Sequence, residues 1–90
     1  MKIVKRGKGK GLAIKYIEEL ETEASRVGIP VNYLIRNVLV MSIGTYYTLK
    51  KTGYTPHFTT LIAIKALSRA LKSFNEKPSL DDIIVYLWKN

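Results

Sequence analysis

The chain has no cysteine and only one histidine, and these two absences exclude several kinds of site. Without cysteine there is no disulfide framework, no thiolate nucleophile and no cysteine-ligated zinc. A single histidine cannot assemble a histidine metal site. The sequence therefore predicts a protein without a metal or other cofactor, one that is suited to a reducing compartment.

Acidic residues are also scarce, with seven Asp and Glu against fifteen Lys and Arg. Four of the seven, Glu18, Glu19, Glu21 and Glu23, alternate around a predicted helix, with no nucleophile, base or second cluster of metal ligands nearby. Asp81 and Asp82 are explained by the helix start at which they occur. No set of residues supports a catalytic mechanism, so we expect the protein not to be an enzyme.

No apolar run is long enough to suggest a membrane segment. The most apolar stretch, residues 27–49, contains Arg36, and its longest uncharged piece is shorter than the roughly 20 residues that a bilayer requires. The basic N-terminus is followed by a Glu-rich helical pattern and not by the apolar run of a signal peptide. We expect a cytoplasmic protein that is associated with the nucleoid.

Ninety residues, 47% of them hydrophobic, allow one small domain with a core. The net charge of +8 favours a polyanionic partner, nucleic acid first. Residues 1–15 hold six cations and no acid. Within them, Arg6 to Gly11 alternate a cation with glycine. This pattern cannot pack a core, so residues 1–11 are predicted to form a flexible basic arm that contacts phosphates.

Helical periodicity predicts four helices after this arm. The first runs from Leu12 to a stop at Gly28, and the second from Pro30 to a stop near Gly53. A third begins at Thr55-Pro56, and its face with Lys65, Arg69 and Lys72 is expected to be solvated. The fourth begins with a capping box at Ser79 and Asp82.

The second predicted helix is apolar nearly all round. Leu34, Ile35 and Val38 form one stripe, and Leu39 to Ile43 leave almost no polar face. A single chain of this length cannot easily surround such a helix. We therefore expect a homodimer in which a second subunit covers it.

The run from Ala24 to Leu39 resembles the ribbon-helix-helix family of Arc/MetJ/CopG-type repressors. It has a helix ending in Ala-x-x-x-Gly, a short turn, and a second helix with Leu34-Ile35-Arg36 followed by apolar residues. The resemblance covers residues from about 10 to 45. It implies a mainly α dimer in which one short N-terminal strand from each chain pairs into a ribbon that enters the major groove.

Counting back from Gly28 without gaps places the ribbon strand on residues 8–12, which have poor strand propensity. Two other registers fit better. In the favoured one, Leu12, Ile14 and Tyr16 face inward while Ala13 and Lys15 face the groove. In the other, residues 2–6 form the strand. The family usually has Ser or Thr where this chain has Pro30, which leaves the backbone of Val31 and Asn32 to hold a phosphate.

These arguments divide the chain into a basic arm (1–11), a ribbon-helix-helix-like unit (12–50) and a C-terminal helical extension of the same domain (54–90). The expected function is sequence-specific binding of double-stranded DNA by a homodimeric transcriptional regulator. The expected DNA-binding residues are Lys5, Arg6, Lys8, Lys10, Ala13, Lys15, Val31 and Asn32. The expected dimer core comprises Leu12, Ile14, Leu20, Leu34, Ile35 and Val38.

Two other functions fit the sequence. The Gly/Lys arm alone would serve an architectural protein that coats nucleic acid without choosing a sequence. The C-terminal helices, residues 55–90, would serve an antitoxin-like module that binds a protein partner. A helix-turn-helix reading of residues 20–39 is weaker, because only Asn32, Tyr33, Arg36 and Asn37 could contact bases.

Overall fold

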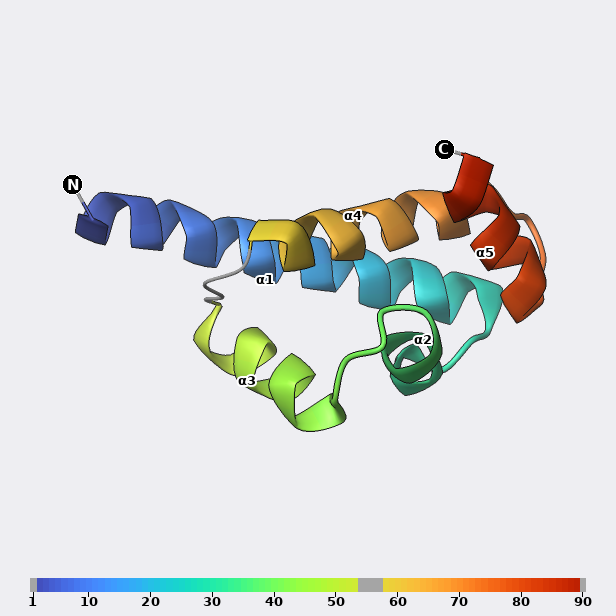
Figure 1. Ribbon diagram of the computed structural model, residues 1–90, viewed down its shortest axis with the longest axis horizontal. Helices are drawn as coiled ribbons and strands as arrows, with labels where there is room; N and C mark the ends of the chain where they lie inside the picture. Colours follow the sequence, from blue (N-terminus) through green and yellow to red (C-terminus); the bar gives the residue numbers. More distant parts are fainter. Residues whose placement is uncertain (1, 54–57, 90) are drawn as a thin grey trace.

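The computed structural model describes residues 2–53 and 58–89, with the backbone alone for residues 2–12. These residues form five helices (Figure 1). The helices are α1 (Lys2–Val27), α2 (Val31–Asn37), α3 (Ile43–Thr52), α4 (Phe58–Lys72) and α5 (Leu80–Lys89). The predicted start of the third helix at Thr55-Pro56 lies outside the described residues.

The core lies between α1 and α4, which run side by side in the same direction, while α2 and α3 lead the chain back below them (Figure 1). Ile17 and Leu20 of α1 and Ile64 and Leu67 of α4 are almost completely buried. The buried alanines Ala13, Ala24 and Ala70 have side chains small enough to let the two helix backbones approach closely. This pair of helices is the frame on which the other three are placed.

Arg26, in the last turn of α1, holds the end of α4. Its Nη2 atom donates hydrogen bonds to the carbonyl oxygens of Leu71 (2.8 Å) and Phe74 (2.9 Å). Its Nε atom pairs with Glu23 at 2.7 Å. The carbonyls at a helix C-terminus have no partner within the helix and carry partial negative charge, so a guanidinium stabilises them.

The turn after α1 follows the sequence prediction. Gly28 has a φ of 81°, in the left-handed region that glycine adopts without steric cost. Its amide donates to the carbonyl of Ala24 at 2.9 Å, as in a helix C-terminus closed by glycine. The predicted helix stop is confirmed, and Ile29 then enters the core.

The segment expected to be one long helix from Pro30 onward is broken, and that prediction was wrong. Residues 38–42 are not helical, and Val40 has a positive φ of 52°. Ser42 starts a new helix, since its Oγ accepts a hydrogen bond from the Thr45 amide at 3.1 Å. The break lets Leu34 and Ile35 of α2 pack into the same core as the residues of α3.

A shared carboxylate joins α3 to α1. The Oε2 atom of Glu21 accepts hydrogen bonds from the hydroxyl of Tyr46 (2.7 Å) and from the Nζ of Lys50 (2.8 Å). Tyr46 is fully buried, and α3 ends at Gly53, whose φ of 71° confirms the predicted stop. Burial and the hydrogen bond to Glu21 raise the pKa of Tyr46 well above its usual value, and the same carboxylate raises the pKa of Lys50.

These shifts predict that the fold loses stability in alkali. A group whose pKa is raised by folding stabilises the native state below its unfolded pKa, and that stabilisation is lost as the pH rises. For Tyr46, with an ordinary pKa of 10.0, we expect the free energy of unfolding to fall by about 1 kcal/mol per pH unit above that value. Denaturant titrations at pH 8 to 11 measure this slope.

The matched variants are Tyr46→Phe and Tyr47→Phe. Tyr46→Phe should flatten the slope, because the buried ionisable hydroxyl is removed. Tyr47 is 51% exposed, so Tyr47→Phe should leave the slope unchanged. Equal slopes for the two variants would show that Tyr46 does not cause the effect.

The fourth predicted helix is present as α5, and its capping box is confirmed. The Ser79 amide donates to Asp82 Oδ2 and the Asp82 amide donates to Ser79 Oγ, both at 3.1 Å. Ile83 is fully buried against the core, and the rings of Phe74 and Tyr86 lie 6.3 Å apart. These contacts fix α5 across the C-terminal end of α4.

The expected ribbon-helix-helix fold is contradicted, because the described residues contain no strand. Residues 2–6, 8–12 and 12–16, the alternatives for the ribbon, all lie within α1. Ala13, Ile17 and Leu20 are spaced so that one helical stripe contacts α4, whereas a strand would place Ala13 and Ile17 on one face and Leu20 on the other. Residues 2–11, expected as an arm, continue the same helix, since extending a helix costs less than starting one.

Candidate nucleic-acid interface

The first turns of α1 project beyond the rest of the bundle. In Figure 1 this part of α1 extends past the start of α4 and past α3. Its five cations, with no acid among residues 2–11, are Lys2, Lys5, Arg6, Lys8 and Lys10. We call residues 2–11 of α1 the basic extension.

The spacing of the core stripe explains why no other helix covers the basic extension. Ala13, Ile17 and Leu20 lie on the stripe that packs against α4. The same spacing, continued toward the N-terminus, reaches Lys10 and Arg6. A helix with cations at its core positions has nothing apolar to bury, so packing ends near Ala13.

Electrostatics make the basic extension a place where negative charge is favoured. The first turn of α1 has no acidic residue, and Lys2 and Lys5 lie close to the positive end of the helix dipole. The cations repel one another as well as the dipole. A bound polyanion relieves both repulsions, which a neutral ligand would not.

Helix propensity makes the basic extension the weakest part of α1. Gly7, Gly9 and Gly11 each cost about 1 kcal/mol relative to alanine within a helix. We therefore expect binding of an anion to stabilise these turns.

Cations continue from the basic extension onto the bundle. Lys15 is exposed on α1, and Lys65 pairs with Glu19 at 3.0 Å. The hydrogen bond from Lys65, helped by the charges of Lys65, Lys72 and Lys15, holds the pKa of Glu19 below its usual value against the opposing effect of burial. Three cations therefore act on one carboxylate.

The structure buries one of the predicted DNA contacts and leaves the others as predictions. Ala13 was expected to face the groove from a strand, but its side chain is fully buried against the core. Val31 and Asn32 begin α2, which has seven residues and no side-chain cap at Pro30. The backbone contact of Val31 and Asn32 with a phosphate stays a prediction. Lys15 is exposed as expected, and the side chains of Lys5, Arg6, Lys8 and Lys10 lie outside the described residues.

The residues expected to form a dimer core are mostly buried within one chain. Leu20, Leu34 and Ile35 are fully buried. Val38 is partly buried against the same core, and Ile14 is only partly exposed. The side chain of Leu12 lies outside the described residues. The apolar residues of the predicted second helix are therefore covered within one chain and do not require a second subunit. The homodimer stays a prediction, and its interface would have to form on another surface.

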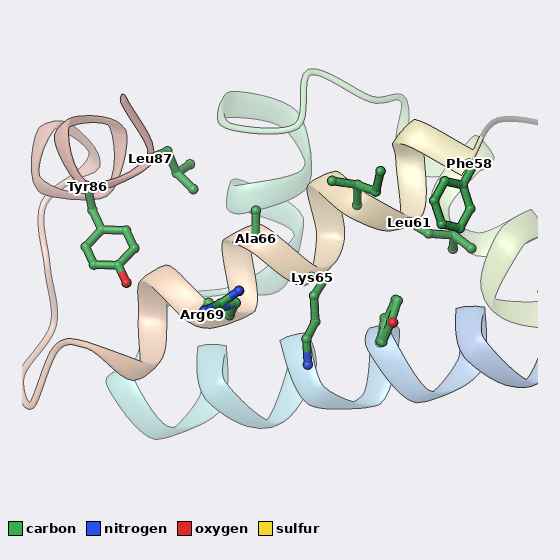
Figure 2. A pocket seen from close by; sticks show the side chains of 9 residues that line it. Phe58, Leu61, Lys65, Ala66, Arg69, Tyr86 and Leu87 are labelled. Carbon is green, nitrogen blue, oxygen red and sulfur yellow. The ribbon is translucent and has the colours of Figure 1, made fainter. Parts of the chain in front are cut away.

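A groove along α4 was not predicted from the sequence. Its volume is ≈ 430 Å³, and Figure 2 shows Phe58, Lys65 and Arg69 of α4 along it, with Tyr86 and Leu87 of α5 at one end. Lys65 points toward α1, where its Nζ lies 5.2 Å from the centre of the Tyr16 ring. The available signal was the helical face shared by Phe58, Ile62, Lys65 and Arg69. Of these residues, Lys65 and Arg69 were expected to be solvated.

Comparison of the chain with protein-family models, curated proteins and solved structures finds no match. In the part of the chain that the structure describes, no three His, Asp or Glu side chains are grouped as a metal site. None of the helices searched, over the same described residues, is both long and apolar enough to cross a bilayer. The basic extension and the groove along α4 are the two surfaces that the function has to explain.

Proposed function

We propose that the protein binds double-stranded DNA through the basic extension of α1. The observation that supports this proposal is the projecting helix with five cations and no acid over residues 2–11. Lysine and arginine bind DNA mainly by neutralising phosphates and releasing counterions. These contacts fix the position of a protein on the duplex but do not read its sequence.

The dimensions of the basic extension suit the major groove. Ten helical residues span about 15 Å, and a helix with its side chains is about 10–12 Å wide, close to the groove width of about 12 Å. At 3.6 residues per turn, its five cationic positions spread over roughly 200° of the helix circumference. Cations spread in this way can reach phosphates on both sides of the groove.

An anionic membrane is a poorer partner for the same residues. Helices that lie on a bilayer bury an apolar face opposite their cations. The basic extension has only two large apolar residues, Ile3 and Val4, and they are adjacent in sequence. Adjacent residues lie about 100° apart on a helix, so they form no apolar stripe. The composition of the basic extension therefore favours a polyanion such as DNA over the surface of a lipid bilayer.

The expected regulator would also have to choose among DNA sequences. Without the ribbon, the base contact predicted for Ala13 is lost, because its side chain is buried. We therefore propose binding that depends on phosphates and discriminates little between sequences. Sequence-specific regulation stays a prediction, which the same binding experiment tests.

The experiment measures binding to a labelled 30-base-pair duplex in competition with unlabelled DNA. We expect random-sequence duplexes to compete as well as any duplex enriched from a random pool. Enrichment of one sequence by a factor of about 10³ or more would instead identify a sequence-specific regulator. Failure to bind any duplex at low salt would refute the DNA-binding proposal itself.

A further inference from the structure

Large apolar side chains are exposed on two neighbouring helices, α4 and α5. The exposed residues on these two helices are Phe58, Ile62, Ile84, Val85 and Trp88. Trp88, the only tryptophan of the chain, is 89% exposed. Exposed aromatic residues of this kind, grouped with other apolar side chains, are typical of protein interfaces.

The groove along α4 has one apolar end and one cationic end. Phe58 and Ile62 form the apolar end, and Arg69, which is exposed, forms the other. Lys65 lies between them but is paired with Glu19. No acidic residue is present among the described residues that line the groove. Its chemistry fits a helix that carries an acid followed by large apolar side chains.

The outward face of α5 has this chemistry. One helical face of α5 carries Asp81, Ile84, Val85 and Trp88. Ile84 and Val85 lie three and four positions after Asp81, and Trp88 lies four and three positions after them. Asp81 is exposed, whereas Asp82 is engaged in the capping box with Ser79. Within its own chain, α5 packs through Ile83 on the opposite side. Ile84, Val85 and Trp88 therefore make up the face of α5 that the chain's own core leaves exposed.

The two surfaces also match in length. Asp81 and Trp88 are seven residues apart on α5, and Ile62 and Arg69 are seven residues apart on α4, about 10 Å in each case. When the two helices run antiparallel, Asp81 meets Arg69 while Trp88 meets Ile62 and Phe58. This register pairs opposite charges at one end and apolar side chains at the other.

We propose that the occupant of the groove along α4 is α5 of a second copy of this chain. Each copy carries one groove and one outward α5 face, so a two-fold pair can use both in each direction. Phe58 and Trp88 supply the aromatic anchors that dominate interface energies. The resulting dimer places two basic extensions on one particle, and it stands independently of whether those extensions bind DNA.

The test is the solution mass of the full chain over a range of concentrations, together with the fluorescence of Trp88. We expect the mass to double and the emission to shift to the blue as the copies associate, because Trp88 leaves water. Trp88→Ala should weaken association on the order of 30-fold, as expected for an aromatic anchor. Trp88 is exposed in the single chain, so this substitution leaves the fold intact.

A charge exchange tests the register. Asp81→Arg and Arg69→Asp should each weaken the dimer, and the double variant should restore it, since the pair is then reversed. Glu18→Arg, an equal change of charge at an exposed position on α1, is the control and should have no effect. A chain that stays monomeric at every concentration would overturn the proposal and leave the groove to an acidic helix of another protein. A dimer indifferent to Trp88→Ala and to the charge exchange would overturn it as well.

Discussion

Replacing Leu67 by alanine is expected to lower the free energy of unfolding by about 3 kcal/mol. Leu67 is fully buried on α4, in the core that α4 shares with α1. Removing its side chain loses apolar burial and leaves a cavity between two helices that cannot close freely. For a small domain this is a large fraction of the total stability. Chemical denaturation followed by circular dichroism measures the change.

Ile62→Ala is the matched control for this prediction. Ile62 lies on the same helix but is 52% exposed, so its truncation should cost well under half as much. The comparison should be made at a concentration where the chain is monomeric. If both substitutions have the same cost, the packing of α4 on α1 is not the main source of stability.

Neutralising the basic extension is expected to have the largest effect on DNA binding. A variant with Lys5, Arg6, Lys8 and Lys10 all changed to glutamine removes four of its five cations. Four lost phosphate contacts should weaken binding to duplex DNA on the order of 10³-fold at physiological salt. Fluorescence anisotropy with a labelled duplex measures the two affinities.

The control removes the same number of charges from the opposite end of the bundle. Arg36 on α2, Lys72 at the end of α4, Lys77 after it and Lys89 on α5 are all exposed. Helix α2, the end of α4 and α5 lie away from the first turns of α1 (Figure 1). Changing these four to glutamine should weaken binding by less than tenfold, through the lower net charge alone. An equal loss in both variants would show that the net charge, and not the basic extension, determines binding.

The local signals in the sequence predicted most helix ends. Gly28 and Gly53 stop α1 and α3 because each takes a positive φ, and this preference can be read from a single residue. The capping box at Ser79 and Asp82 is equally local. Such features depend only on residues a few positions apart, so a single sequence is enough to find them.

The failures came where distant packing decides local structure. The break at residues 38–42 lies in an apolar run without proline or glycine, and it exists because α2 and α3 have to contact different parts of the same core. The ribbon strand was inferred from a family pattern, whereas the spacing of Ala13, Ile17 and Leu20 already indicated a helix. Gly7, Gly9 and Gly11 have low helix propensity, so the continuation of that helix toward Lys2 was not predicted.

The sequence predicted that the candidate site is cationic, but it did not predict that these cations lie on a helix. Concentrated lysine and arginine could be located by counting, which is why the basic extension was found. The burial of Ala13 and the groove along α4 depend on which helix faces become neighbours. Arg69 and Ile62 line a groove because α5 packs at the end of their helix. The helical periodicity of the sequence does not predict this tertiary contact.

The most direct test of the account is the salt dependence of duplex binding by the intact chain and by the variant with glutamine at residues 5, 6, 8 and 10. The logarithm of the association constant should fall with the logarithm of salt concentration with a slope of about −0.9 per neutralised phosphate. With five cations in the basic extension we expect about −4.5 for the intact chain, and with one left about −0.9 for the variant. Equal slopes for the two proteins would contradict the claim that the N-terminal turns of α1 contact DNA phosphates.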